Sequence, residues 1–235
     1  MCTLLDSHPD ILCHHELFNP EGIHIAWSLR GSGFSLGDLP ARQADPLGLL
    51  ERAWQQHLDF RAVGFKLNIH GPPEVQAAVL EDPAVLKIVL ERRSRIRSFL
   101  SEQIAERTGV WESYPDSRRQ EESTAAVHVD AADLLGHAER NRRYYAGLRQ
   151  RLVEIGQVCH ELVFEELADP ETQCSLLRFL GVDDSVALTG NTRRMNPQSL
   201  DALIANLSQL RDELVGTPLA GELATAHSPD KRGNT

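Results

Sequence analysis

Short apolar runs alternate with longer segments of helical periodicity along this chain. Runs with the length of strands are Ile11–Cys13, the alternating segment 61–70, Val85–Leu90 and 160–167. Apolar residues recur at helical spacing in Thr3–Leu5, 47–58, 73–80, 96–104, 134–155, 176–180 and 200–214. Strands that alternate with helices predict an α/β fold with a mainly parallel sheet and right-handed crossovers.

The segment from Val85 to Trp111 combines a strand, a basic turn and a helix. The apolar run ends at Leu90, a polar turn follows, and Gly109 stands where a helix would end in a left-handed conformation. Ligands of open α/β sheets bind beyond the carboxyl ends of strands. Arg93 stands at that end, and Ser101 follows eight residues later, about two turns into the helix.

A guanidinium at the turn and a hydroxyl nearby suit an anionic group such as phosphate. The alternative is a solvated basic helix start, formed by Arg92, Arg93, Arg95 and Arg97. Spacing alone does not separate the two interpretations.

Composition and charge limit the function. The chain has 235 residues, which suits one domain over residues 1–220 followed by a disordered tail at 221–235. Its formal charge of −10 argues against nucleic acid as a partner, while local basic clusters favour a small anionic ligand. The four cysteines lack metal-ligand spacing, and no signal segment or membrane span is evident, so we expect a cytoplasmic protein.

Several segments together resemble the sulfotransferases that use 3′-phosphoadenosine 5′-phosphosulfate (PAPS). In that family an apolar strand beginning with lysine leads to an arginine, and a serine follows eight positions later. Lys87-Ile-Val-Leu-Glu-Arg-Arg93 and Ser101 match this pattern in register. Weaker matches follow in order over residues 4–216: the segment Leu5–Phe18, Gly64-Phe-Lys66, Ala105–Trp111, and the pair Val163–Leu167 and Phe179–Val182.

The resemblance is closest to bacterial sulfotransferases that act on carbohydrates. It implies a P-loop NTPase-like three-layer α/β/α fold and the transfer of a sulfuryl group from PAPS, as co-substrate, to a hydroxyl of a carbohydrate or glycolipid. It assigns Arg93 and Ser101 to the 3′-phosphate of the donor. It also implies a small-molecule or glycan acceptor and no metal. The oligomeric state stays open, and a homodimer is one of the arrangements allowed.

The chain departs from the family at its beginning. The family's first strand and phosphosulfate-binding loop, Arg-x-Gly-[Ser/Thr], would precede Met1-Cys2-Thr3. Either the true start lies upstream of Met1, or the chain is a truncated, non-catalytic copy. We favour the upstream start, because the core pattern of the remaining chain is coherent. A P-loop kinase is a weaker alternative, because Gly-x-x-x-x-Gly-Lys-[Ser/Thr] is absent from the sequence.

Glu16 is the candidate catalytic base. In the enzymes that this chain resembles, a glutamate at this position is the proposed acceptor of the hydroxyl proton. The competing bases are His14 and His15, since histidine titrates near neutral pH; a purely structural role for Glu16 is the other alternative. The four histidines His8, His14, His15 and His24 match no standard metal spacing, so we expect no metal site.

Further residues have weaker assignments. Lys66 could face the site or lie at a sheet edge, and the pair Arg193–Arg194 could close over a nucleotide or remain an exposed charge pair. Trp54 and Trp111 are expected in the core or in a cleft wall. The segments 21–45 and 112–122 are loop candidates for acceptor binding, by position only.

Overall fold

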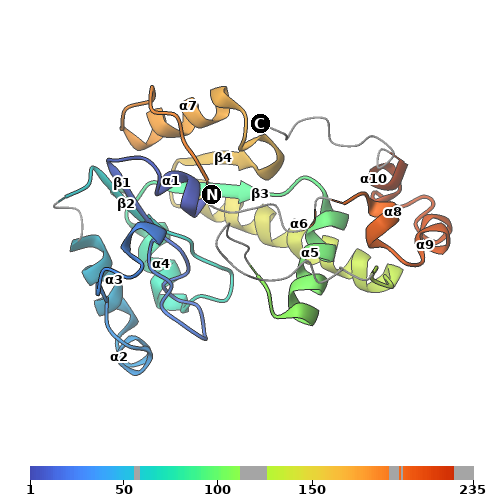
Figure 1. The fold of residues 1–235 in the computed structure, drawn as a ribbon, viewed down its shortest axis with the longest axis horizontal. Helices are drawn as coiled ribbons and strands as arrows, with labels where there is room; N and C mark the ends of the chain where they lie inside the picture. Colours follow the sequence, from blue (N-terminus) through green and yellow to red (C-terminus); the bar gives the residue numbers. More distant parts are fainter. Residues whose placement is uncertain (56–58, 112–125, 191–195, 197, 225–235) are drawn as a thin grey trace. The chain divides into compact units, whose positions relative to one another are not determined.

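The computed structural model describes residues 1–55, 59–111, 126–190, 196 and 198–224. Within the single domain expected over residues 1–220, two compact units are distinguished (Figure 1). The first unit comprises Met1–Glu91 and Gln150–Asn191, and the second comprises Arg92–Arg149 and Thr192–Thr235.

Parallel strand pairs form the centre of the first unit. Strand β1 (Ile11–His14) pairs with β2 (Ala62–Phe65), and β3 (Lys87–Glu91) pairs with β4 (Cys159–Val163). The predicted strands are therefore confirmed, although β2 and β4 are shorter than the apolar patterns indicate. The α/β class with parallel pairing is confirmed as well. In the described residues the strands form two separate two-stranded sheets, so the three-layer sheet remains an expectation.

The described helices that lie wholly within the first unit are α1 (Cys2–Leu5), α2 (Leu39–Ala44), α3 (Pro46–Trp54), α4 (Pro73–Glu81) and α7 (Pro170–Leu180). Among them, α7 carries clear local signals at both ends. The start of α7 is typical, because the Asp169 carboxylate accepts a hydrogen bond of 3.0 Å from the amide of Thr172. Gly181 ends the helix with a φ of 70°. These signals lie at the two ends of α7, which is why the sequence predicts this helix.

Two expectations for the first unit are corrected. The segment 21–45, expected as an irregular loop, contains a 3₁₀ turn at Trp27–Leu29 and the helix α2. The predicted strand 160–167 ends at Val163 and continues as a 3₁₀ turn at Phe164–Glu166. The first segment is therefore more regular than expected, and the second strand is shorter than expected.

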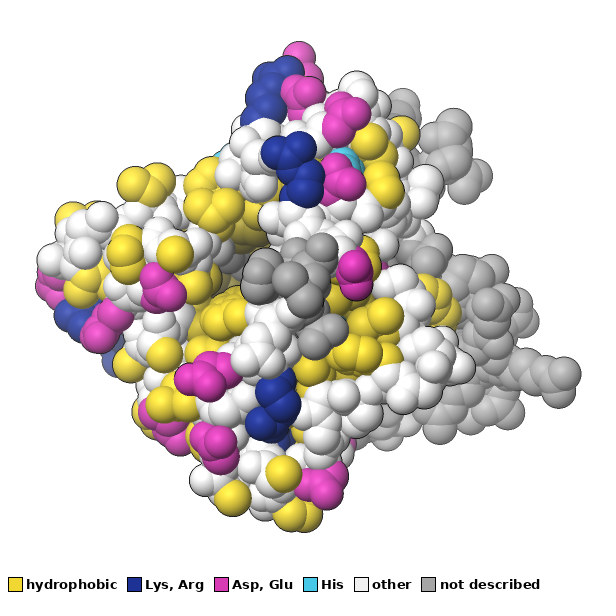
Figure 2. All heavy atoms as spheres, turned by 90° about the vertical axis from the view of Figure 1, so that its left-hand side faces the viewer, with side chains coloured by type: hydrophobic (Ala, Val, Ile, Leu, Met, Phe, Trp, Pro, Cys, Tyr) yellow, Lys and Arg dark blue, Asp and Glu magenta, His cyan; other side chains and the backbone are white. Residues whose placement is uncertain are grey.

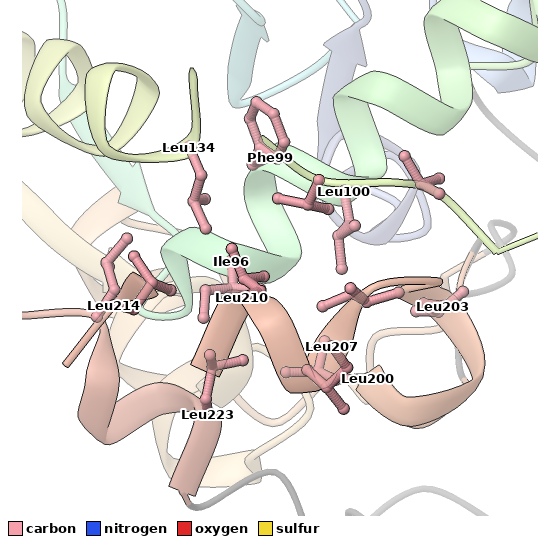
Figure 3. Close-up of a cluster of buried hydrophobic side chains, with 14 of the residues drawn as sticks. Ile96, Phe99, Leu100, Leu134, Leu200, Leu203, Leu207, Leu210, Leu214 and Leu223 are labelled. Atoms are coloured by element: carbon pink, nitrogen blue, oxygen red, sulfur yellow. The ribbon is translucent and has the colours of Figure 1, made fainter. Parts of the chain in front are cut away.

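Helices build the second unit. They are α5 (Arg95–Thr108), α8 (Leu200–Leu203), α9 (Leu207–Glu213), α10 (Ala220–Ala224) and α6 (Ala131–Glu154) as far as Arg149. Figure 3 shows Ile96 and Leu100 of α5 beside leucines of the C-terminal helices. Ile96 is fully buried and Leu100 nearly so. Burial of such side chains contributes about 1.5–3 kcal/mol each, which fixes the orientation of α5.

The C-terminal part differs from the single helix predicted over 200–214. Helix α8 ends because Ile204 forms a parallel bridge with Val127: the Val127 amide donates to Leu203 O (2.8 Å) and the Ala205 amide to Val127 O (2.9 Å). Residues 220–224 form α10 and bury Leu223, so the expected tail does not begin at Gly221. Residues 225–235 lie outside the described part of the chain.

No single type of side chain dominates the face of the molecule drawn in Figure 2. On the face drawn in Figure 2, acidic and basic side chains are interspersed with hydrophobic ones. Among the described helices, none is long and apolar enough to cross a membrane.

Candidate functional site

The start of α5 is fixed immediately after strand β3. Ser94 is the N-cap residue, and its hydroxyl oxygen accepts a hydrogen bond of 3.2 Å from the amide of Arg97. At the other end Gly109 adopts a φ of 68°, as the sequence predicts. The chain therefore passes from the parallel strand through Arg92 and Arg93 into a helix of defined register.

Arg92 and Ser101 meet across this helix start. Nη1 of Arg92 donates to Oγ of Ser101 over 3.1 Å and to the carbonyl of Arg97 over 3.4 Å. The sequence favours Arg93 for this position and treats Arg92 as its neighbour. The structure thus adds Arg92 as a candidate, which the sequence did not distinguish because two adjacent arginines satisfy the same strand–turn pattern. Arg93 stays a candidate beside it, in the same turn.

The amino end of α5 already holds a carboxylate of the chain itself. Glu222 accepts hydrogen bonds from Ser94 Oγ (2.8 Å), the Arg95 amide (3.1 Å) and the Ile96 amide (3.2 Å). An anion is favoured there, because the helix dipole and the first amides point toward it. Glu222 thereby ties α10 to α5, and a further anion near this turn would have to be bound by side chains.

The other arginines of the turn take part in packing contacts. Nη1 of Arg97 donates to the carbonyls of Asn196 (3.4 Å) and Gln198 (3.2 Å). The guanidinium of Arg95 lies 5.6 Å from the centre of the Tyr145 ring, and that of Arg149 lies 5.7 Å from it. These contacts assign Arg95 and Arg97 to the structure of the second unit.

Glu16 lies in the first unit, just beyond the end of β1. Its carboxylate accepts a hydrogen bond from Lys66 Nζ (2.6 Å) and another from Asn19 Nδ2 (2.7 Å). The parallel register places His14 opposite Phe65, so the segments that follow both strands run side by side. Lys66 was not expected to pair with Glu16; the adjacent carboxyl ends of two parallel strands were the signal that could have indicated it.

The environment of Glu16 keeps its carboxyl group ionised. Burial acts to raise its pKa, but hydrogen bonds from Lys66, Asn19 and Asn68 outweigh burial and hold the pKa below its usual value of 4.5. The Glu16 side chain is 19% exposed. Glu16 is therefore a carboxylate at neutral pH and can accept a proton or a hydrogen bond from a hydroxyl.

Arg42 fixes the loop that carries Glu16 and Asn19. Its Nη1 donates to the carbonyls of Leu17 (3.1 Å), Asn19 (2.6 Å) and Gly22 (3.0 Å). Arg42 is only 5% exposed. A buried guanidinium that donates to three carbonyls holds this loop in one shape. The sequence contains no local signal for this contact, because α2 and the loop are about twenty residues apart.

The histidines near Glu16 are buried, which weakens their case as bases. His14 is fully buried and its Nδ1 accepts a hydrogen bond of 3.0 Å from the Ala26 amide. Burial, together with the charge of His15, lowers the pKa of His14 to about 4. Since its acceptor nitrogen is already used, His14 is a poor proton acceptor. His15 is buried as well, and its carbonyl accepts a hydrogen bond from the Lys66 amide (3.0 Å).

Some of the remaining candidate residues pack in the interior, one is exposed, and others lie in parts of the chain that the structure does not describe. His8 is buried, where Nδ1 accepts from the Asp10 amide and Nε2 lies 3.0 Å from Asp183 O. Trp54 packs against Phe65, as expected for a core aromatic, whereas Trp111 is 62% exposed and belongs to no core. Arg193, Arg194 and the segment 112–122 lie outside the described residues.

The described side chains do not include a group of three or more His, Cys, Asp or Glu that could hold a metal ion. No family model, no curated protein and no solved structure matches the chain.

Proposed function

We propose that this protein is a PAPS-dependent sulfotransferase that transfers a sulfuryl group to a hydroxyl of a carbohydrate or glycolipid. The proposal includes a P-loop NTPase-like three-layer α/β/α fold. The observation that carries it is the contact between Arg92 Nη1 and Ser101 Oγ at 3.1 Å. The resemblance pairs Ser101 with Arg93, and this contact supports the proposal by bringing a guanidinium of the same turn, that of Arg92, to the Ser101 hydroxyl.

Arg92, Arg93 and Ser101 would bind the 3′-phosphate of the donor. A guanidinium can bind two phosphate oxygens at once, and the serine hydroxyl can donate to another. Because Glu222 occupies the amides at the start of α5, the phosphate would be held by these side chains. The donor supplies an activated sulfuryl group; the chain's own contribution at this turn is to bind and orient it.

Glu16 would accept the proton of the acceptor hydroxyl. The carboxylate is ionised at neutral pH, and Lys66 and Asn19 keep it in one position. The low pKa makes Glu16 a weak base, so the proton would move only late in the reaction, when the oxygen becomes acidic. This role concerns the first unit, whereas the residues proposed for donor binding belong to the second.

The test is a calorimetric titration of the full chain with 3′-phosphoadenosine 5′-phosphate, the product of the donor. We expect Ser101→Ala and Arg92→Met each to weaken binding roughly 10- to 100-fold, since each removes a hydrogen bond to a charged group. Arg107→Met, a change near the end of α5, serves as the matched control and should leave binding unchanged. Equal affinity in wild type, Ser101→Ala and Arg92→Met would contradict the assignment.

A further inference from the structure

Exposed apolar side chains gather at the amino ends of β3 and β4. Leu86 directly precedes β3 and Val158 directly precedes β4, and the first residues of these two parallel strands are paired. Leu86 is 50% exposed and Val158 is 77% exposed. Val153, near the end of α6, is 78% exposed. Pro83 and Ala84 are exposed as well, in the loop that leads to β3. These five residues form what we call the strand-start patch, which lies within the first unit.

Hydrogen bonds hold the segments of the strand-start patch in fixed positions. The buried Lys87 ammonium donates to the carbonyl of Asp82 and to Oε1 of Gln157 (3.0 Å). Nε2 of Gln157 donates to the Glu81 carbonyl (3.3 Å), and the Gln157 amide donates to the Leu152 carbonyl (2.8 Å). The end of α6 is thereby joined to the loop that leads to β3. A surface fixed in this way loses little conformational entropy when a partner binds.

The charges beside the strand-start patch are mainly negative. The segments that carry it contain the exposed acidic residues Glu81, Asp82 and Glu154 and the exposed basic residue Arg151. Arg151 is already paired with Glu81, since its Nη2 lies 2.9 Å from Oε1. The carboxylates of Asp82 and Glu154 therefore leave negative charge next to the apolar side chains. Two copies of a chain with a formal charge of −10 repel each other, so the charges favour a basic partner over a second copy.

We propose that the strand-start patch is a docking surface for a segment of another protein in which apolar side chains are flanked by lysine or arginine. Exposed apolar residues that are grouped at one place and bordered by polar residues are typical of an interaction site. The apolar side chains of the partner cover Leu86, Val153 and Val158, and its cations pair with Asp82 and Glu154. Removal of the apolar surface from water provides most of the affinity, and the charges orient the partner.

This inference does not depend on the proposed function. The strand-start patch lies at the amino ends of the strands, whereas the turn proposed for donor binding follows the carboxyl end of β3.

The test is a calorimetric titration of the full chain with a synthetic amphipathic peptide of leucine and lysine. We expect one peptide to bind per chain, with an affinity that falls as salt is added. The double variant Val153→Ser, Val158→Ser should bind the peptide at least about 10-fold more weakly, because it removes apolar surface from the contact. Val215→Ser, at a 76% exposed position of the second unit, is the matched control and should bind like wild type.

A charge reversal tests the electrostatic part of the inference. Glu154→Lys should weaken binding of the leucine–lysine peptide and reduce its dependence on salt. Glu171→Lys makes the same change at an exposed position at the start of α7, which follows the carboxyl end of β4, and should have no such effect. A peptide in which glutamate replaces lysine should bind more weakly to wild type.

Three results would overturn the inference. The first is the absence of binding of the leucine–lysine peptide to wild type. The second is equal affinity in wild type and in the double variant Val153→Ser, Val158→Ser. The third comes from sedimentation equilibrium, in which we expect wild type and Val158→Ser to be monomers. A wild-type dimer that Val158→Ser dissociates would show that a second copy of the chain covers the patch.

Discussion

Lys66 Nζ lies 2.6 Å from Oε1 of Glu16, so the candidate base of this protein is held in an ion pair by the neighbouring parallel strand. The pair explains how a carboxylate with a 19% exposed side chain remains ionised. It also links the electrostatics of the Glu16 loop to the register of β1 and β2, because Lys66 follows β2 directly.

Replacing Lys66 by methionine should raise the pKa of Glu16. The folded-state pKa of Glu16 is depressed, so the pair stabilises the protein above about pH 4.5 and this contribution is lost as the pH falls through the folded pKa. Lys66 is 46% exposed, so the free energy of unfolding at pH 7 should fall by less than about 1 kcal/mol. A carbon-detected NMR titration of Glu16 measures the pKa, with Lys66→Arg as the charge-conserving control. An unchanged pKa in Lys66→Met would refute the role of the pair.

His14 should make the protein sensitive to mild acid. Its pKa of about 4 in the folded state lies below its usual value of 6.5, so the unfolded chain binds the proton first as the pH falls. The contribution of His14 to the free energy of unfolding is fully present above pH 6.5. It is lost as the pH falls from 6.5 to 4, and the loss amounts to at most about 3 kcal/mol.

Urea unfolding of His14→Gln and wild type over this pH range measures the effect. The variant should lose stability less steeply with falling pH, whereas the exposed control His24→Gln should follow wild type. Parallel curves for His14→Gln and wild type would show that His14 is not the acid-sensitive group.

Arg42 should be essential for the shape of the Glu16 loop. Arg42→Met removes the donor to three carbonyls in the segment Leu17–Gly22. We expect the free energy of unfolding to fall by roughly 2–4 kcal/mol, since buried acceptors are left unpaired. Arg61→Met, at an exposed position, provides the control for loss of a positive charge. A loss below about 0.5 kcal/mol in Arg42→Met would contradict this role.

Ser94 should stabilise the start of α5 in two ways, by capping the Arg97 amide and by donating to Glu222. Ser94→Ala is expected to cost about 1–2 kcal/mol in thermal or urea unfolding. Ser98→Ala, one turn further into the helix, removes a hydroxyl without removing the cap and should be neutral or slightly stabilising. Equal effects of both substitutions would argue against the cap.

The predictable parts of the fold are those with local signals. Helix α7 begins at Asp169–Pro170 and ends at Gly181, and these residues determine its ends almost independently of the rest of the chain. The break after α8 was not predictable. Asn206 pairs through its side-chain amide with the backbone of Val129 (both contacts 2.9 Å), a long-range contact that no periodicity encodes.

In the candidate site, too, the features with local signals are predictable and the long-range contacts are not. The strand–turn–helix around Arg93 and Ser101 is local, so the sequence locates it, but the choice of Arg92 as the partner of Ser101 depends on side-chain geometry. The partnership of Glu16 with Lys66 depends on which strands pair and in what register. Arg42 was missed for the same reason, because its partners lie in a different segment.

A comparison of two nucleotides that differ only in the 3′-phosphate tests the central proposal most directly. The dissociation constants of the wild-type chain for 3′-phosphoadenosine 5′-phosphate and for adenosine 5′-phosphate are measured under the same ionic conditions. If Arg92, Arg93 and Ser101 bind the 3′-phosphate, the first ligand should bind at least about 10-fold more tightly, and Ser101→Ala should reduce this ratio. Equal dissociation constants for the two ligands, or no binding of either, would contradict the proposal.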